Sequence, residues 1–276
     1  MAKDQVKIAK TVCNMCLTRC GIDVSVEGGK IVKVAGMPEH PRNTLCVKAQ
    51  AIPELVHSTE RLTTPLRKVG GVWQEISWDE AFDFVADKLT NIKQKYGAKA
   101  VVIHLGNAFI STQTEKVVRR FTDLYGTPNY TTGAAFCYLA RTIGHALTLG
   151  THIFPHYSSD TRCMVAWGNN PRESSPLQAD AMQTMLARGA KLIVIDPRAT
   201  PLAKEANICA QIRPGTDCAL ALGLLNVIIT EGLYDKAFVE QWTVGFDKLV
   251  EHVKGYPPER VEEITWVKAD IIRNMA

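Results

Sequence analysis

The chain has 276 residues, of which 46% are hydrophobic and 22% are charged, and its formal net charge is +4. This length and composition suit a globular protein with one large domain or two modest ones. The small charge without a long basic run argues against nucleic-acid binding, and no run approaches the eighteen apolar residues of a membrane span.

The amino-terminal sequence, MAKDQVKIAK, lacks the apolar core of a secretory signal and has no twin arginine. We therefore expect a cytoplasmic protein, unless the amino terminus has been processed.

Up to about residue 60 the sequence is rich in short strand and turn patterns. Apolar residues alternate over 22–26 and 31–34 on either side of Gly28-Gly29, which predicts a β-hairpin. A loop rich in Pro and Asn, 37–43, then leads to Cys46.

A second strand pair is expected within 62–76, with its turn at Gly70-Gly71. The sequence pattern changes from strands and turns to helix at Ser77. This residue and Glu80 form a capping box at the start of a predicted helix. Apolar residues follow at helical spacing as far as Leu89.

Strands and helices then alternate as far as residue 230. The predicted strands cover 100–105, 163–168, 191–196 and 208–213, and the predicted helices cover 112–125, 137–149, a segment ending at 188, and 219–230. This alternation predicts a parallel sheet covered by helices. Residues 235–276 predict short helices with no closing strand. The expected fold class is α/β, with a small β-rich domain over 1–60 followed by a parallel-sheet α/β region over 61–276.

Four of the eight cysteines lie in the first 46 residues, in the pattern C-x2-C-x3-C, and 25 residues separate this triplet from the fourth. They are Cys13, Cys16, Cys20 and Cys46. In a cytosolic chain such clustering indicates metal ligands rather than disulfides. A compact triplet plus one distant cysteine suits a [4Fe-4S] cluster. A structural zinc site is the alternative. Zinc ribbons usually have two C-x2-C pairs, and this chain has one, which argues against zinc. The spacing is not among the common ferredoxin patterns, which argues against the cluster.

The later cysteines and the histidines permit less specific predictions. Cys163, Cys209 and Cys218 lie in or beside apolar segments, so we expect them to be buried packing residues. A metal site can be imagined for His145, His152 and His156, but Pro155 interrupts any helix that would align the last two. Loop or core histidines with satisfied hydrogen bonds are the favoured interpretation.

The cysteine pattern and a series of ordered motifs resemble the molybdopterin oxidoreductases, the dimethyl sulfoxide reductase group. That group includes formate dehydrogenases, nitrate reductases, thiosulfate and polysulfide reductases, and acetylene hydratase. The motifs are RLTTPL (61–66), ISWDEA (76–81), GTPN (126–129), WGNNP (167–171), IDPRAT (195–200) and RPGTD (213–217). The resemblance covers essentially the whole chain.

The resemblance implies a [4Fe-4S] domain over 1–60 and a molybdopterin-dinucleotide-binding region over 61–276. It implies two molybdopterin guanine dinucleotides per complete enzyme, with molybdenum or tungsten between them. Members are several hundred residues longer, so we expect the C-terminal domains to be absent from this chain. The chain is then either a fragment, inactive alone, or a subunit whose missing half is a separate chain.

Two residues are assigned catalytic roles by the resemblance. Lys48 occupies the position of the lysine between cluster and proximal pterin, although a solvated surface lysine is the alternative. Cys137 lies eight residues after Asn129, at the spacing of the metal-binding cysteine or selenocysteine of formate dehydrogenases, and a buried free cysteine is the alternative.

The chain departs from two members of the family at informative positions. Formate dehydrogenases follow their metal ligand with a histidine, whereas Tyr138 follows Cys137. Acetylene hydratase carries an aspartate just after its second cluster cysteine, whereas Leu17 follows Cys16. These departures put formate chemistry and hydration in doubt, and thiosulfate- or polysulfide-type reduction stays open.

Contacts to the dinucleotide are expected beyond the carboxyl ends of the parallel strands. By resemblance, the loops 106–107 and 168–170 approach the pterin and phosphates. Asp196 accepts hydrogen bonds from a ribose, with Arg198 nearby, and the loop 215–217 borders the guanine. Turn or helix-cap chemistry is the alternative for each. The candidates are Gly106, Asn107, Gly168, Asn169, Asn170, Asp196, Arg198, Gly215 and Asp217. No G-x-G-x-x-G motif supports a nicotinamide site.

The leading hypothesis is therefore the front part of a molybdenum or tungsten oxidoreductase. Electrons would pass between a small substrate at the metal and the cluster, and from there to a partner electron-transfer protein or subunit. A non-redox lyase like acetylene hydratase and a catalytically inactive electron-relay subunit are the alternatives.

Overall fold

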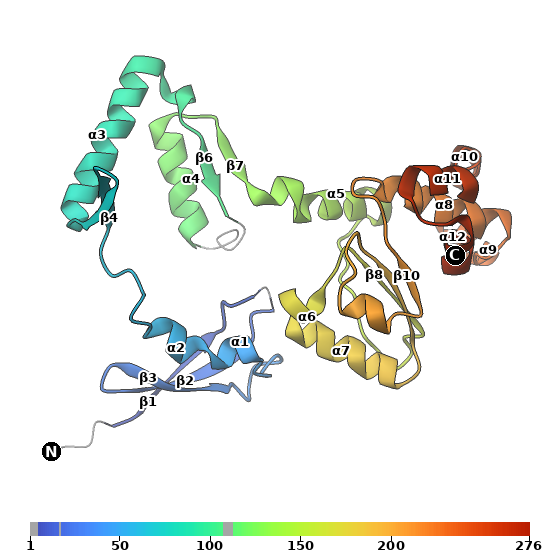
Figure 1. Cartoon of the computed structure of the whole chain (residues 1–276), viewed down its shortest axis with the longest axis horizontal. Coiled ribbons are helices and arrows are strands. Elements are labelled where there is room, and N and C mark those ends of the chain that lie inside the picture. The colour runs from blue at the N-terminus through green and yellow to red at the C-terminus, as the bar shows by residue number, and fades with distance from the viewer. Residues whose placement is uncertain (1–4, 17, 107–112) are drawn as a thin grey trace. The chain divides into compact units, whose positions relative to one another are not determined.

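The computed structural model describes residues 5–16, 18–106 and 113–276, without the side chains of 135 and 136. The chain forms two compact units, the first made of 1–57 with 156–276 and the second of 58–155. Figure 1 shows the elements of both in chain order. Among the described residues, no helix combines the length and the apolar character needed to cross a membrane.

The first unit begins with an antiparallel sheet of three strands in the order β1 (Lys7–Val12), β2 (Gly21–Glu27) and β3 (Lys30–Gly36). The predicted β2–β3 hairpin is confirmed. Strand β1 was not predicted, because its exposed sequence KIAKTV mixes polar and apolar residues on both faces. Two short helices follow, α1 (Val47–Gln50) and α2 (Ile52–Val56).

Two glycines of this sheet allow the loop before Cys46 to pack directly on it. Gly21 and the Gly36 backbone lie at neighbouring positions of β2 and β3, since Ile22 pairs with Gly36. A Cβ at Gly36 would overlap the carbonyl oxygen of Asn43, and a Cβ at Gly21 would overlap the side chain of His40. Glycine at both positions therefore lets the chain return toward β2 before it reaches Cys46.

The second sheet of the first unit is parallel, in the order β10 (Ile208–Ala210), β9 (Lys191–Ile195) and β8 (Cys163–Trp167). The predicted strands are confirmed, but β10 ends at Ala210 rather than at residue 213. The chain turns away there, and the Arg213 N–H donates to the carbonyl oxygen of Thr265 at 2.9 Å.

Alternating residues of β9 face two different layers of helices. On one face Leu192 and Val194 join a core that includes residues of α7 (Pro176–Ala187) and the short 3-10 helix Leu202–Glu205. On the other face Ile193 and Ile195 pack with residues of α8 (Asp217–Thr230), α11 (Pro258–Thr265) and α12 (Ala269–Met275). The sheet is thus covered on both sides, as the alternation of strands and helices predicted.

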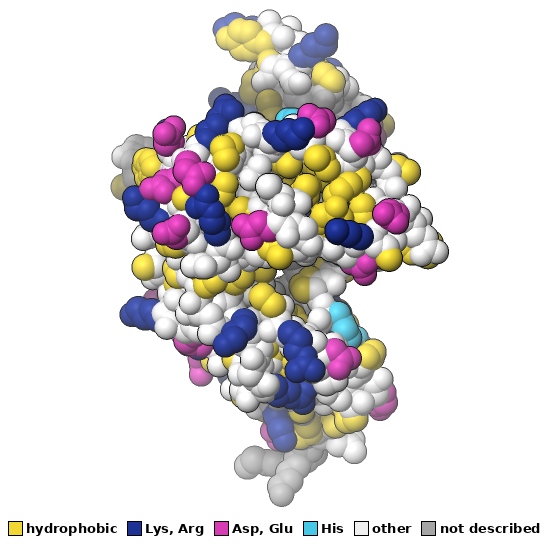
Figure 2. All heavy atoms as spheres, turned by 90° about the vertical axis from the view of Figure 1, so that its right-hand side faces the viewer, with side chains coloured by type: hydrophobic (Ala, Val, Ile, Leu, Met, Phe, Trp, Pro, Cys, Tyr) yellow, Lys and Arg dark blue, Asp and Glu magenta, His cyan; other side chains and the backbone are white. Residues whose placement is uncertain are grey.

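The short helices predicted over 235–276 are present, and those not yet described are α9 (Lys236–Trp242) and α10 (Phe246–Val253). One further short helix of the first unit, α6 (Pro171–Ser174), lies between β8 and α7. Hydrophobic side chains gather on the face that Figure 2 shows, which is the right-hand side of Figure 1. Among the C-terminal helices and their loops, Trp242, Val244 and Trp266 are exposed.

The second unit contains the predicted strand pair, β4 (Leu66–Val69) and β5 (Val72–Glu75), and then α3 (Trp78–Tyr96). The capping box at the start of α3 is confirmed: Glu80 N–H donates to Ser77 Oγ at 3.1 Å, and Ser77 N–H to Glu80 Oε2 at 2.8 Å. The other elements are the 3-10 helix Ala98–Ala100, β6 (Ile103–Leu105), α4 (Gln113–Tyr125), β7 (Tyr130–Thr132), the 3-10 helix Gly133–Phe136 and α5 (Tyr138–Leu149).

The parallel strands do not form the single sheet that was predicted. Strand β6 pairs with β7 in the second unit, and β8 to β10 form a separate sheet in the first. The sequence pattern missed β7 because three residues are too short to show an alternation. After β7 the chain enters helical structure instead of a further strand.

A substitution at Gly36 tests the contact that positions Cys46. We expect Gly36→Ala to lower the free energy of unfolding by on the order of 1–3 kcal/mol, because its methyl group meets backbone that cannot rotate away. Urea denaturation of the purified chain measures this change. Gly144→Ala is the control, since a Cβ there meets open space and alanine favours its helix; equal stability of the two variants would contradict the account.

Candidate functional site

The four amino-terminal cysteines gather at one end of the first sheet. Cys13 and Cys20 are buried in the same hydrophobic cluster as Ile22, and Cys46 packs against that cluster. The Cys13 N–H donates to the Cys20 carbonyl oxygen at 2.7 Å, which closes the loop that carries the triplet. None of the four is in a disulfide.

The thiols are close enough to influence each other electrostatically. Burial raises the pKa of the Cys20 thiol, and negative charge on Cys16, Cys13 and Cys46 raises it further. A bound cation reverses this preference, because a coordinated thiol is held as thiolate. Four free thiols beside an apolar cluster are a donor set that fits an iron–sulfur cluster.

Within the ranges 5–16, 18–106 and 113–276, no three His, Cys, Asp or Glu side chains are arranged so that they could hold a metal ion. An iron–sulfur cubane binds its cysteines through separate iron atoms, so its ligands need not converge on one point.

Lys48 connects the cysteine-bearing part to the second sheet of the same unit. Its Nζ donates to the carbonyl oxygens of Glu173 at 3.0 Å and Ser174 at 3.3 Å, at the end of α6. Lys48 is half-buried, so it is not a freely solvated surface lysine. Its role beside a pterin stays a prediction.

Helix α6 begins directly after an amide without partners. Both Oδ1 and Nδ2 of Asn170 are buried, and neither has a hydrogen-bond partner within the described residues. An unsatisfied buried amide is costly unless something bonds it. Asn170 follows the carboxyl end of β8, where a dinucleotide contact was predicted, so the residues present fit a polar ligand there.

The other candidates of the first unit lie at the same edge of the parallel sheet. Gly168, with φ +56°, donates its N–H to the Ile195 carbonyl oxygen at 2.8 Å, which joins the ends of β8 and β9. Asp217 Oδ1 accepts from Trp167 Nε1 at 2.7 Å, which joins the end of β8 to the start of α8. The structure thus brings together Gly168, Asn169, Asn170, Asp196, Arg198, Gly215 and Asp217 around the carboxyl ends of β8, β9 and β10.

The acidic candidates already have partners within the chain. Asp196 is buried, and its Oδ1 accepts from the Arg198 N–H at 2.8 Å, with Arg198 Nε at 3.6 Å. Thr216 precedes α8 but makes no side-chain cap, so the capping alternative is not seen for it. Gly215, at φ +82°, gives the turn before α8 its left-handed backbone.

Two other predicted residues, Gly106 and Cys137, belong to the second unit and are described only within it. Gly106 follows β6 and is exposed, whereas Asn107 lies outside the described residues. Cys137 is exposed and precedes α5, so the alternative of a buried cysteine is wrong. Its role as a metal ligand stays a prediction.

The remaining cysteines were predicted wrongly. Cys163, Cys209 and Cys218 are all exposed. The error arose because the inward and outward positions of a short strand, or of a helix such as α8, cannot be told apart when nearly every residue is apolar.

Two of the histidines form part of a ring cluster made by α5 and the segment that follows it. The ring centroid of His152 lies 5.0 Å from that of His145, 5.1 Å from Tyr138 and 4.7 Å from Phe154. The Tyr138 hydroxyl lies 3.5 Å from His152 Nδ1, and His152 Nε2 is buried with no partner within the described residues. The expectation that the hydrogen bonds of these histidines are satisfied is therefore wrong for His152.

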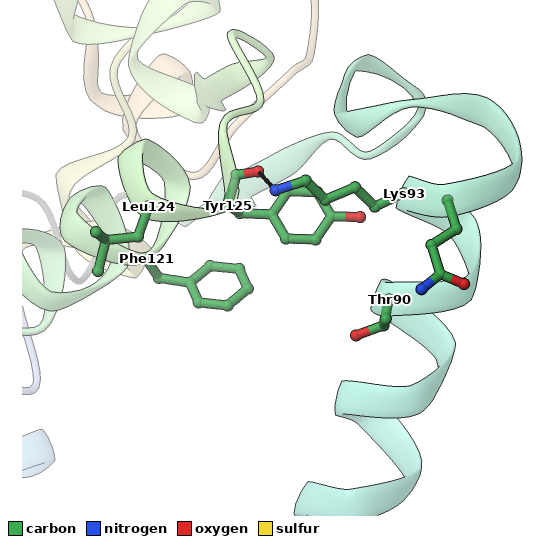
Figure 3. A pocket seen from close by; sticks show the side chains of 6 residues that line it. Thr90, Lys93, Phe121, Leu124 and Tyr125 are labelled. Atoms are coloured by element: carbon green, nitrogen blue, oxygen red, sulfur yellow. Dashed lines mark hydrogen bonds between the residues drawn. The ribbon is translucent and has the colours of Figure 1, made fainter.

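A pocket of about 540 Å³ lies elsewhere in the second unit, lined by residues of α3 and α4. Figure 3 shows Lys93 and Tyr125 at this pocket, where the Lys93 Nζ donates to the Tyr125 carbonyl oxygen at 2.7 Å. Its lining is Thr90, Lys93, Gln94, Phe121, Leu124 and Tyr125, and includes none of the predicted site residues.

Sequence reasoning missed two residues at these sites. Trp167 was not nominated, although an indole N–H at the end of a buried strand needs an acceptor. Arg42 was not nominated either, although it is a basic residue in the loop that leads to Cys46. Its guanidinium Nη1 donates to the Thr18 carbonyl oxygen at 3.2 Å, between Cys16 and Cys20.

Comparison with known proteins matches two successive parts of the chain to family models. Residues 6–58 match the model of the molybdopterin oxidoreductase Fe4S4 domain, and residues 61–272 match that of molybdopterin oxidoreductase. The chain belongs to the molybdopterin oxidoreductase family. The implied cofactors of this family are a 4Fe-4S cluster and a molybdenum or tungsten pterin.

Similar proteins include acetylene hydratase from Syntrophotalea acetylenica, 38% identical over 96% of this chain and 37% of that protein. Formate dehydrogenase H from Escherichia coli is 34% identical over 98% of this chain and 39% of that protein. The solved structure of acetylene hydratase from Pelobacter acetylenicus superimposes with a TM-score of 0.73 and 36% identity, over 96% of this chain and 38% of that one. The chain thus spans less than half the length of these relatives.

The pH dependence of stability tests the environment of His152. Burial, followed by the positive charge of His145 and Arg141, lowers the pKa of His152. The folded chain therefore binds fewer protons than the unfolded chain, whose histidine pKa is about 6.5, so stability falls as pH drops below about 6.5.

We expect His152→Gln to flatten this dependence in urea denaturation between pH 7 and pH 5, since glutamine does not titrate. The same substitution at exposed His104 of the same unit is the control. An identical pH slope in wild type and His152→Gln would contradict the assignment.

Proposed function

We propose that the chain is the front part of a molybdenum or tungsten pterin oxidoreductase that passes electrons between a small substrate and a [4Fe-4S] cluster. The observation that carries the proposal is the gathering of Cys13, Cys16, Cys20 and Cys46 around one apolar cluster, in a chain of this family. When bound, the metal and its pterins supply the two-electron chemistry, and the cluster accepts or donates electrons singly.

The proposed roles of the residues follow from their positions. The four cysteines hold the cluster as thiolates. Lys48 places a cation two residues beyond Cys46 and ties the segment to α6. The edge of the β8–β10 sheet binds the dinucleotide. Asn170 offers its amide, which has no partner among the described residues, and Asp196 and Asp217 offer carboxylate oxygens.

Cys137 is the proposed protein ligand of the molybdenum or tungsten. Its thiol is exposed at the start of α5, where a soft ligand is accessible to a metal. Tyr138 beside it takes the place of the histidine of formate dehydrogenases, which favours a substrate other than formate, such as a sulfur compound. A partner chain or carrier protein takes up the electrons, and the cytoplasmic location stays a prediction.

A non-redox hydratase is the second candidate, and the 38% identity to acetylene hydratase favours it. Leu17 argues against it, because it stands where that enzyme has an aspartate. Turnover of the native protein distinguishes the two: a redox enzyme needs an electron-accepting or electron-donating dye, whereas a hydratase converts its substrate without one.

Substitution of one cysteine tests the cluster. We expect Cys20→Ser to lose the electron paramagnetic resonance signal of a reduced four-iron cluster, because a serine hydroxyl is a poor ligand for iron in such a cluster. Cys218→Ser, at an exposed cysteine of the same unit, is expected to keep full iron and signal. Loss of iron from both variants, or from neither, would refute these ligands.

Substitution of Cys137 tests the metal ligand separately. In the native full-length protein or assembly, Cys137→Ser should lower dye-linked turnover by roughly 100-fold or more, since loss of even an outer partner of a metal ligand typically costs 10- to 100-fold. The cluster signal should persist. Cys163→Ser is the control, and turnover of Cys137→Ser equal to that of the control would show that Cys137 is not the ligand.

A further inference from the structure

Arg42 holds together the two segments that carry the cysteines. Its carbonyl oxygen accepts the Gly21 N–H at 2.8 Å, directly after Cys20, and its own N–H donates to His40 Nδ1 at 3.0 Å. Both of these bonds use main-chain atoms of Arg42. A different side chain at this position therefore leaves them in place.

The side chain of Arg42 adds a charge to this main-chain clamp. Its guanidinium reaches the Thr18 carbonyl oxygen at 3.2 Å, inside the loop between Cys16 and Cys20. Thr18 lies two residues from Cys16 and two residues from Cys20, so this hydrogen bond holds the positive charge at the loop that carries the triplet. The guanidinium is thus fixed between two of the cysteines in the sequence.

The segments that carry the cysteines have basic side chains and no acidic ones. Residues 13–20 and 40–48 contain no Asp or Glu. Of their basic side chains, Lys48 is bound to α6, and Arg19 bonds the Asn14 side chain. Arg42 contacts the loop of the triplet twice: its guanidinium bonds the Thr18 carbonyl oxygen, and its own carbonyl oxygen accepts from Gly21.

We propose that Arg42 tunes the reduction potential of the cluster by stabilising its reduced form. This inference rests on the proposed cluster. One-electron reduction makes and breaks no bond and makes the cluster more negative by one charge. A fixed cation nearby favours that product, so the potential is higher than it would be without it. Because Arg42 is exposed, salt screens the effect.

A redox titration of the native protein, followed by electron paramagnetic resonance, tests the proposal. We expect Arg42→Gln to shift the midpoint potential of the cluster to a more negative value, with a smaller shift at high salt. Arg42→Lys should keep nearly the wild-type value. Lys33→Gln removes the same charge from an exposed position on β3 and should leave the potential unchanged.

Each other result has a defined meaning. A potential in Arg42→Gln equal to that in Lys33→Gln, or a shift in Arg42→Lys as large as in Arg42→Gln, overturns the role of the charge while the cluster itself stands. If Arg42→Gln loses iron and Arg42→Lys keeps it at the wild-type potential, the charge is what the site needs, which supports the role. Loss of iron from both overturns it. No four-iron signal in the wild type would overturn the cluster and this proposal together.

Discussion

The cysteine site depends on the close packing of one loop against two glycines. Gly21 and Gly36 have no side chain where His40 and the Asn43 carbonyl approach the sheet, so the chain can fold back before Cys46. The fourth cysteine, 26 positions after the third, therefore reaches the same apolar cluster as Cys13 and Cys20. A larger side chain at either glycine would move this segment away and break up the set of four thiols.

The same segment carries the contact with the α/β part of its unit. Lys48 donates to the last carbonyl oxygens of α6, and α6 starts at the carboxyl end of β8. The buried side-chain amide of Asn170 there has no hydrogen-bond partner in the part of the chain that the structure describes. A short run of the chain thus joins the proposed cluster ligands to the proposed dinucleotide edge. Helix layers on both faces of β9 hold that edge in place.

Local patterns predicted those parts of the fold that neighbouring residues determine. The β2–β3 hairpin and the capping box at Ser77 depend on residues a few positions apart, and the cysteine spacing is itself a local pattern. Strand β1 was missed because its side chains do not separate by polarity, and β7 because it is too short.

The long-range contacts of the site could not be predicted in this way. Lys48 finds its acceptors 125 and 126 residues away, and Trp167 finds Asp217 50 residues away. The direction of each side chain on a wholly apolar strand also depends on which helices pack there, which explains the wrong prediction for Cys163. The family motifs nominated residues at the strand ends, and the structure shows how seven of them share one edge.

The central claim is that four cysteines hold one four-iron cluster. Native mass spectrometry of the protein purified without oxygen, together with iron and acid-labile sulfide analysis, tests this most directly. The account predicts four iron and four sulfide per chain. One zinc ion per chain, with no sulfide, would contradict it.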